Sequence, residues 1–126
     1  MTSLPPPQKV LIVDDDGTTR LLMRQSMESA GYTVVEAGDG QKAIECLLLH
    51  RPDIVLLDVN MPNVDGFSAC KQMRKVPGAE NLPIIMVTGL DDYESIKQAY
   101  DIGATDFITK PINWLILTYR VRYILR

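Results

Sequence analysis

The chain has 126 residues, of which 46% are hydrophobic and 23% are charged, and its formal net charge at pH 7 is −3. This length and composition are typical of one globular domain and exclude an intrinsically disordered chain. No uncharged apolar run reaches the ~18 residues of a membrane-spanning helix, and the acidic balance disfavours direct binding of nucleic acid.

Residues 1–8 contain three consecutive prolines, which predict a flexible N-terminal tail. The start of the chain is polar and proline-rich, so no secretory signal is expected. Cys46 and Cys70 do not form a Cys-x-x-Cys motif, which argues against a zinc site. We therefore expect two reduced thiols in a cytoplasmic protein, and His50, the only histidine, receives no catalytic role.

The first half of the chain alternates between strand and helix patterns. Residues 10–13 form a continuous aliphatic run, which is typical of a strand buried on both faces of a parallel sheet. Residues 18–30 have apolar side chains at helical spacing, and residues 33–37 predict a second strand. Asp39 can cap a helix over residues 40–50. The expected buried stripe of that helix is Ala43, Ile44, Leu47 and Leu48.

The second half repeats the alternation three times. The predicted strands are residues 54–58, 83–88 and 106–110, and the predicted helices are residues 65–75, 92–102 and a last helix, capped by Asn113, that runs to residue 126. Five strands alternating with five helices predict a parallel sheet covered on both faces. Ligand chemistry in such a sheet belongs at the carboxyl ends of the strands.

Polar side chains follow four of the five predicted strands. They are Asp14, Asp15 and Asp16 after the first strand, Asp58 at the end of the third, Thr88 at the end of the fourth and Lys110 at the end of the fifth. Carboxylates gathered at one edge repel one another, and a hard divalent cation such as Mg²⁺ relieves that repulsion. A lysine and a threonine on the same rim suit phosphate oxygens. Any one aspartate after a strand is ordinarily a helix cap, as expected for Asp16 and Asp39. The prediction of a magnesium and phosphate site therefore depends on suitable polar residues occurring at four strand ends together.

The segments around these residues together resemble the signature of response-regulator receiver domains. They are Val13-Asp14-Asp15-Asp16, Asp58-Val59-Asn60-Met61-Pro62-Asn63-Val64-Asp65-Gly66, Val87-Thr88-Gly89 and Lys110-Pro111. The resemblance implies an α/β, flavodoxin-like (βα)5 doubly wound parallel sheet with strand order 2-1-3-4-5. It also implies that residues 9–126 form a receiver domain, a signalling module rather than an enzyme acting on an external metabolite.

The resemblance assigns roles to the strand-end residues. In the family, the aspartate at the position of Asp58 accepts a phosphoryl group from a histidine kinase or a phosphotransfer protein. Asp14, Asp15 and Asp58 match the residues that hold Mg²⁺, together with the backbone carbonyl of Asn60. We also expect the peptide bond between Lys110 and Pro111 to be cis.

The remaining roles concern contact with the phosphoryl group and signalling. Thr88 and Lys110 match the residues that contact the phosphoryl oxygens. Thr88 and Phe107 match a switch pair, in which the aromatic side chain fills the space that the hydroxyl residue leaves. The resemblance therefore implies a signalling face formed by residues 92–102, 106–110 and 113–126.

The last predicted helix has more apolar residues than packing on a sheet needs. Leu117 and Val121 form one stripe, and Ile116, Tyr119 and Tyr123 form a second. We expect the second stripe to join a homodimer contact on the signalling face, and the helix to continue into a C-terminal output domain. The segments 87–92 and 111–123 resemble receivers attached to cyclic-di-GMP signalling domains, namely diguanylate cyclases with or without a phosphodiesterase.

Three alternatives compete with this interpretation. A phosphohydrolase of the haloacid dehalogenase type needs a second aspartate two residues after the nucleophile, where this chain has Asn60. A flavodoxin needs a phosphate-binding loop after the first strand, and Asp14 to Asp16 would repel a flavin phosphate there. An interaction module with a degenerate site is disfavoured, because this chain has the expected aspartate, threonine and lysine residues at the site positions of the family.

Overall fold

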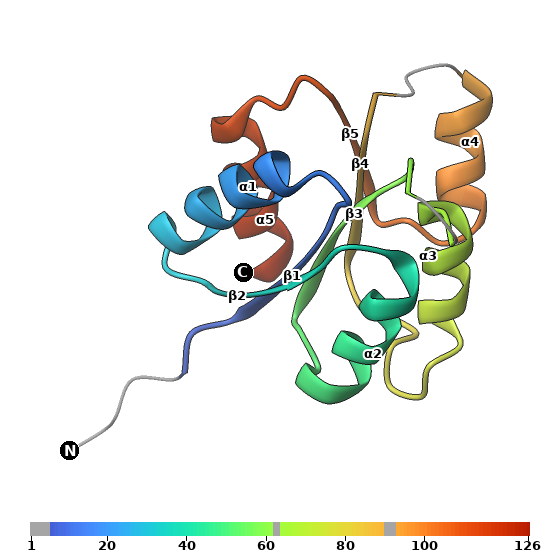
Figure 1. Ribbon diagram of the computed structural model, residues 1–126, viewed down its shortest axis with the longest axis horizontal. Coiled ribbons are helices and arrows are strands. Elements are labelled where there is room, and N and C mark those ends of the chain that lie inside the picture. Colours follow the sequence, from blue (N-terminus) through green and yellow to red (C-terminus); the bar gives the residue numbers. More distant parts are fainter. Residues whose placement is uncertain (1–5, 62–63, 90–92) are drawn as a thin grey trace.

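The computed structural model describes residues 6–61, 64–89 and 93–126. The strands form one parallel sheet in the order β2-β1-β3-β4-β5, which confirms the predicted topology (Figure 1). They are β1 (Lys9–Val13), β2 (Thr33–Ala37), β3 (Ile54–Asp58), β4 (Ile84–Thr88) and β5 (Asp106–Thr109). β1 and β3 occupy central positions because their side chains are apolar on both faces of the sheet.

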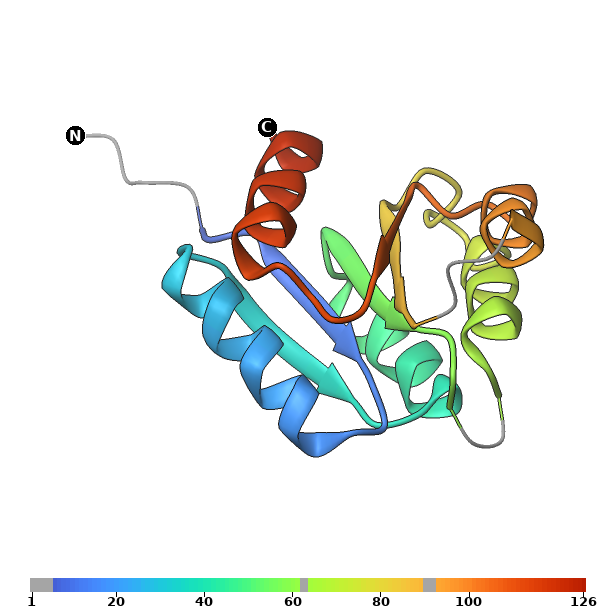
Figure 2. The same ribbon diagram turned by 90° about the horizontal axis from the view of Figure 1, so that it is seen from above.

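In the described part of the chain, five helices cover the two faces of the sheet (Figure 2). They are α1 (Gly17–Ser29), α2 (Gly40–His50), α3 (Gly66–Arg74), α4 (Tyr93–Asp101) and α5 (Trp114–Leu125). α1 and α5 lie on one face, and α2, α3 and α4 lie on the other. The bounds agree with the predicted ones to within one residue, except that Asp92, the predicted start of the fourth helix, lies outside the described residues.

Short polar side chains start the helices where the sequence predicted caps. The side chains of Asp16, Asp39 and Asn113 each accept a hydrogen bond from the backbone N–H three residues later. Asp65 does the same at the start of α3. Gly31, with a φ angle of +97°, follows the end of α1 in a backbone conformation that other residues rarely adopt.

The sheet divides the apolar core into two clusters. Met23 and Met27 of α1 pack with Leu117 and Val121 of α5 on one face. Leu47 of α2 belongs to the cluster on the other face, which also includes residues of α3 and α4. Leu48 was expected in the buried stripe of α2, but it is 51% exposed, because the inward face of this helix passes through Gly40, Ala43 and Leu47.

Arg74 at the end of α3 connects the loop between α3 and β4 to the loop between α4 and β5. Its Nε and Nη2 atoms donate hydrogen bonds to the backbone oxygen of Gly103 at 3.0 and 2.6 Å, and its Nη1 atom donates to the backbone oxygens of Ala79 and Leu82. The guanidinium therefore supplies partners for carbonyl groups that no strand or helix satisfies. Among the described residues, no helix combines the length and the apolar character that crossing a membrane requires.

Candidate functional site

Three carboxylates meet where β1 and β3 end. Asp14 and Asp15 follow β1, and Asp58 is the last residue of β3, in the strand adjacent to β1. Each offers an oxygen atom that lies within 4.8 Å of the oxygens offered by the other two. Asp14 and Asp58 are buried, whereas Asp15 is exposed. A set of hard oxygen ligands with one side open to solvent fits Mg²⁺, which keeps several waters in its shell.

Lys110 brings a positive charge to the same edge. Its Nζ atom lies 3.1 Å from Asp14 Oδ2 and 3.5 Å from Asp58 Oδ1. It follows β5, and the peptide bond to Pro111 is cis, as predicted. Burial opposes the charge of the ammonium, but the carboxylates of Asp58 and Asp14 outweigh that effect and raise the pKa of Lys110. The lysine therefore stays protonated beside the two buried aspartates.

Asp58 is an unusually basic carboxylate. Burial and the neighbouring Asp14 charge raise its pKa from 3.8 to about 6, although Lys110 and a hydrogen bond from the backbone of Asn60 act in the opposite direction. Its side chain is 5% exposed, so water stabilises its charge poorly. The structure thus places a buried anion next to a cation and two further anions, an arrangement that a bound divalent cation would balance.

The other predicted site residues lie around this cluster. Thr88 is fully buried at the end of β4, between the strands that carry Asp58 and Lys110. Phe107 is half-buried on β5 and contributes to a pocket with Ile96 and Tyr100 of α4. The side chain of Asn60 is exposed, two residues after Asp58. The sheet therefore brings Asp14, Asp15, Asp58, Thr88 and Lys110 to one edge, while Phe107 lies farther back on β5.

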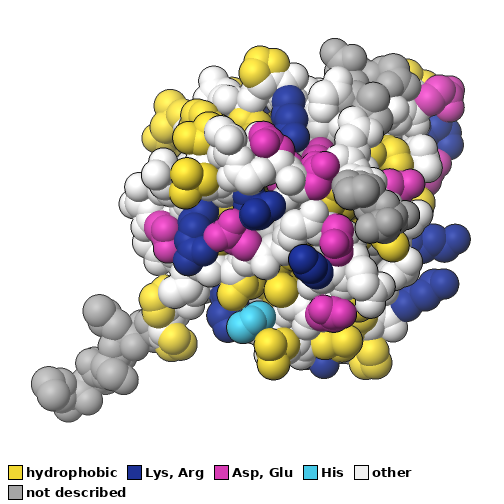
Figure 3. Space-filling model, viewed as in Figure 1, with side chains coloured by type: hydrophobic (Ala, Val, Ile, Leu, Met, Phe, Trp, Pro, Cys, Tyr) yellow, Lys and Arg dark blue, Asp and Glu magenta, His cyan; other side chains and the backbone are white. Residues whose placement is uncertain are grey.

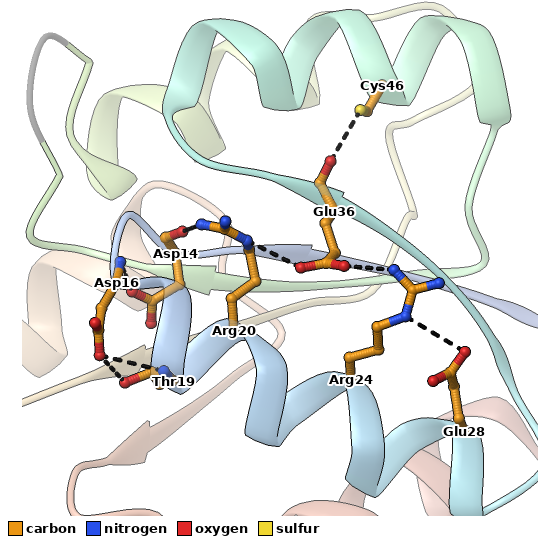
Figure 4. Close-up of polar contacts among 8 residues, drawn as sticks. All are labelled: Asp14, Asp16, Thr19, Arg20, Arg24, Glu28, Glu36 and Cys46. Atoms are coloured by element: carbon orange, nitrogen blue, oxygen red, sulfur yellow. Dashed lines mark hydrogen bonds and ion pairs between the residues drawn. The ribbon is translucent and has the colours of Figure 1, made fainter.

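Two features near the cluster were missed by the sequence analysis. A Cβ atom at Gly66 would lie 2.2 Å from the backbone oxygen of Asp58, so this position needs glycine. Arg20 of α1 donates a hydrogen bond to the backbone oxygen of Asp14 (Figure 4). Gly66 belonged to the motif quoted for the receiver resemblance, but its packing role was not inferred. Arg20 gave no local signal, because its partners lie on other segments of the chain.

The charged surface is mixed rather than of one sign. On the face shown in Figure 3, acidic and basic side chains are interspersed with scattered apolar ones. In its described part, this face of the molecule therefore has no broad basic area that could bind the phosphate backbone of a nucleic acid.

Comparisons with known proteins agree on the family. Residues 10–122 match the family described as the response regulator receiver domain. The chain is 38% identical over 119 residues to the "Probable transcriptional regulator ycf27" of Guillardia theta, covering 94% of this chain and 46% of that protein. It is 36% identical over 118 residues to the "DNA-binding dual master transcriptional regulator RpaA" of a Synechocystis strain, covering 94% and 49%. The chain thus spans about half the length of the curated relatives it matches.

Solved structures show the same fold. The chemotaxis protein CheY4 of Vibrio cholerae superimposes with a TM-score of 0.90 at 33% identity, over 94% of this chain and 99% of that one. A putative response regulator from Chloroflexus aurantiacus gives a TM-score of 0.90 at 36% identity, over 94% and 98%. The curated relatives named above are transcriptional regulators, so they give no support to the resemblance with cyclic-di-GMP receivers.

Proposed function

The chain belongs to the family of response-regulator receiver domains, and from this premise we propose that Asp58 accepts a phosphoryl group from the phosphohistidine of a histidine kinase or phosphotransfer protein. The observation that carries the proposal is the environment of the Asp58 carboxylate. It is buried, it faces Lys110 at 3.5 Å, and oxygens of Asp14 and Asp15 lie within 4.8 Å.

We further propose that the acidic cluster holds Mg²⁺. Asp14, Asp15 and Asp58 supply carboxylate oxygens. The resemblance to the family adds the backbone carbonyl of Asn60 as a further ligand. These are the oxygen donors that Mg²⁺ prefers. When bound, the cation offsets the carboxylate charges and adds positive charge beside the phosphoryl oxygens.

In the proposed phosphoryl transfer, Asp58, Lys110 and Thr88 have different roles. A carboxylate oxygen of Asp58 forms a bond to phosphorus while the bond from phosphorus to the imidazole nitrogen of the donor breaks, and that nitrogen keeps the electron pair. Lys110, already beside Asp58, stabilises negative charge on the phosphoryl oxygens, and the Thr88 hydroxyl contacts the same oxygens. Water later hydrolyses the acyl phosphate and restores the carboxylate, so the modification resets itself.

The proposed output of phosphorylation is a change on one face of the domain. A phosphoryl group adds about −1.5 to −2 charges and new acceptor oxygens at the end of β3. We propose that the Thr88 side chain moves toward those oxygens and that the Phe107 ring fills the space behind it. Phe107 already lines a pocket with Tyr100 of α4 and Ile116 of α5, so its movement would reshape the signalling face, which consists of α4, β5 and α5.

The proposal includes two partners beyond the phosphoryl donor. The signalling face exposes Tyr100, Ile116, Tyr119 and Tyr123, which supports a homodimer contact there. A covalent output domain is the other partner, and the relatives' names favour a DNA-binding one over the cyclic-di-GMP output suggested by the sequence. We propose no direct contact between the residues of this chain and nucleic acid. The cytoplasm is the compartment proposed for the protein.

Incubation with acetyl phosphate and Mg²⁺, followed by intact-mass spectrometry, tests the function. We expect one labile phosphoryl adduct on the native protein and none on Asp58→Asn, because the amide is a poor nucleophile. Asp39→Asn is the matched control, since asparagine caps a helix as well as aspartate does and position 39 lies at the start of α2. An adduct that persists in Asp58→Asn and maps to another residue would overturn the assignment.

A further inference from the structure

Two arginines of α1 share one glutamate of β2 (Figure 4). Arg20 Nε donates a hydrogen bond to Glu36 Oε1 at 2.9 Å, and Arg24 Nη1 donates to Glu36 Oε2. Arg24 Nε also lies 3.4 Å from Glu28 Oε2, one turn farther along the helix. Glu36 points to the α1 face because it alternates with Val35, whose side chain lies on the opposite side of the sheet.

Arg20 has a second partner that Arg24 lacks. Its Nη1 atom donates a hydrogen bond of 2.7 Å to the backbone oxygen of Asp14. Asp14 comes directly after β1, and its backbone N–H donates to the oxygen of Ala37 at 3.2 Å. The peptide groups on both sides of the Asp14 Cα atom are therefore fixed, one by the end of β2 and the other by α1.

The contact with Arg20 does not involve the Asp14 carboxylate. Oδ1 accepts a hydrogen bond from the backbone N–H of Asp16, and Oδ2 lies 3.1 Å from Lys110 Nζ. Arg20 bonds the carbonyl oxygen instead, so it holds the residue without neutralising the side chain. A cation placed among the carboxylates of Asp14, Asp15 and Asp58 would then not compete with the guanidinium for the same oxygens.

The guanidinium is suited to this double contact. Its Nε and Nη1 atoms point in different, fixed directions, so one side chain can bridge the Glu36 carboxylate and the Asp14 carbonyl. Glycines lie on two sides of it: a Cβ atom at Gly38 would be 3.6 Å from Nη1, and one at Gly17 would be 4.0 Å from Nη2. A lysine carries all its donors on one nitrogen atom, so it cannot reproduce contacts that leave from two separate nitrogens, Nε and Nη1.

We propose that Arg20 is a positioning residue for the acidic cluster: by bridging Glu36 and the Asp14 carbonyl, it fixes Asp14 in the orientation that Mg²⁺ binding requires. The proposal rests on the proposed function, because it assumes that the cluster holds Mg²⁺. The physical reason is that a ligand held in place before binding loses less freedom when the cation arrives. Removing a group that orients a metal ligand commonly weakens metal affinity by about 10-fold or more.

The experiment compares Arg20→Met with Arg24→Met. Each variant removes one guanidinium from Glu36 and one positive charge from α1, but only Arg20→Met also removes the hydrogen bond to the Asp14 carbonyl. In Mg²⁺ titrations followed by amide chemical shifts at pH 7, we expect about a 10-fold weaker affinity for Arg20→Met. For Arg24→Met we expect less than a twofold change. Arg20→Lys keeps the charge but not the bridge, and should stay close to Arg20→Met.

Hydrogen exchange without metal gives a second measurement. The amide of Asp16 donates to Asp14 Oδ1, so it should exchange several-fold faster in Arg20→Met than in Arg24→Met, relative to amides of β3 in the same protein. Equal Mg²⁺ affinities and equal exchange rates in the two variants would overturn the inference. Recovery of native Mg²⁺ affinity by Arg20→Lys would also overturn it. Absence of Mg²⁺ binding to the native protein would instead contradict the proposed function, while the exchange comparison would still test how Arg20 holds Asp14.

Discussion

Gly66 packs so closely against Asp58 that a Cβ atom at position 66 would lie 2.2 Å from the Asp58 backbone oxygen. The same atom would lie 2.6 Å from the Cα atom of Val59, so the obstacle is backbone that cannot rotate away. The N–H group of Gly66 also donates to the Val59 oxygen at 2.9 Å. The first turn of α3 is thus joined directly to the segment that carries the proposed phosphoacceptor.

Gly66→Ala should damage both the fold and the site. The methyl group forces α3 or the end of β3 to move, and we expect the free energy of unfolding to fall by about 2–4 kcal/mol. Phosphorylation by acetyl phosphate should slow as Asp58 shifts. Gly89→Ala is the control, because among the described residues no heavy atom beyond its chain neighbours lies within 4 Å of the added Cβ, and its stability should change by about 0.5 kcal/mol or less. Equal urea midpoints for the two variants would contradict the packing argument.

Asp58→Asn should stabilise the metal-free protein in a pH-dependent way. The folded state raises the pKa of Asp58 from 3.8 to about 6, so between these values the folded protein binds more protons than the unfolded chain. Stability is therefore lost as the pH rises through this range, and the loss reaches about 3 kcal/mol above pH 7. The asparagine variant avoids that loss.

Urea unfolding in EDTA at several pH values measures the effect. The advantage of Asp58→Asn over the native protein should be largest at pH 8 and should shrink toward zero at pH 4. An advantage that stays constant across this range would mean that the ionisation of Asp58 is not its cause. Asp39→Asn again serves as the control for loss of a single carboxylate.

Mg²⁺ should stabilise the native protein through the acidic cluster. A cation that binds only the folded state raises the melting temperature as its concentration increases. Asp15→Asn should reduce that rise strongly, because Asp15 is the exposed member of the cluster and one of its three proposed carboxylate ligands. Thermal scans with a series of Mg²⁺ concentrations measure the effect. If Asp15→Asn and Asp39→Asn show the same rise as the native protein, Mg²⁺ binds elsewhere.

Phosphorylation should promote dimer formation through α5. Tyr119 and Tyr123 are 59% and 65% exposed and lie with Ile116 along one groove. We expect Tyr119→Glu to prevent association, because it would place an unpaired charge in the contact. Leu49→Glu on α2 is the control, since that leucine is also exposed but lies outside the signalling face. Analytical ultracentrifugation with Mg²⁺ and beryllofluoride tests this, and monomers at all concentrations would contradict it.

The sequence was sufficient for the fold because its signals were local. The mainly aliphatic run of residues 54–58 indicates a buried strand. A capping side chain such as Asn113 accepts a hydrogen bond from a backbone N–H only three residues away. Leu48 was misplaced because helical spacing alone does not distinguish the inward face of α2 from its flank. Phe107 was assigned from family resemblance rather than from its surroundings.

The site was only partly predictable. Parallel topology brings Asp14, Asp58 and Lys110 to one edge, and this follows from their positions at strand ends. The pKa of Asp58 could not be anticipated, because it depends on burial and on distances to two other charges. The bridge from Arg20 to Glu36 joins residues on different elements, so no pattern along the chain indicates it.

The division of the apolar core by the sheet has a consequence for how this sequence can vary. Met23 and Met27 fill one compartment, and Met73 and Met86 fill the other, with strand backbone between them. A change of side-chain volume on one side is poorly compensated by a residue on the other, because the two sets form separate clusters on opposite faces of the sheet. Substitutions in different compartments should therefore act additively on stability, whereas pairs within one compartment should show epistasis. The α1–α5 side and the α2–α3–α4 side can accordingly accumulate substitutions as independent units.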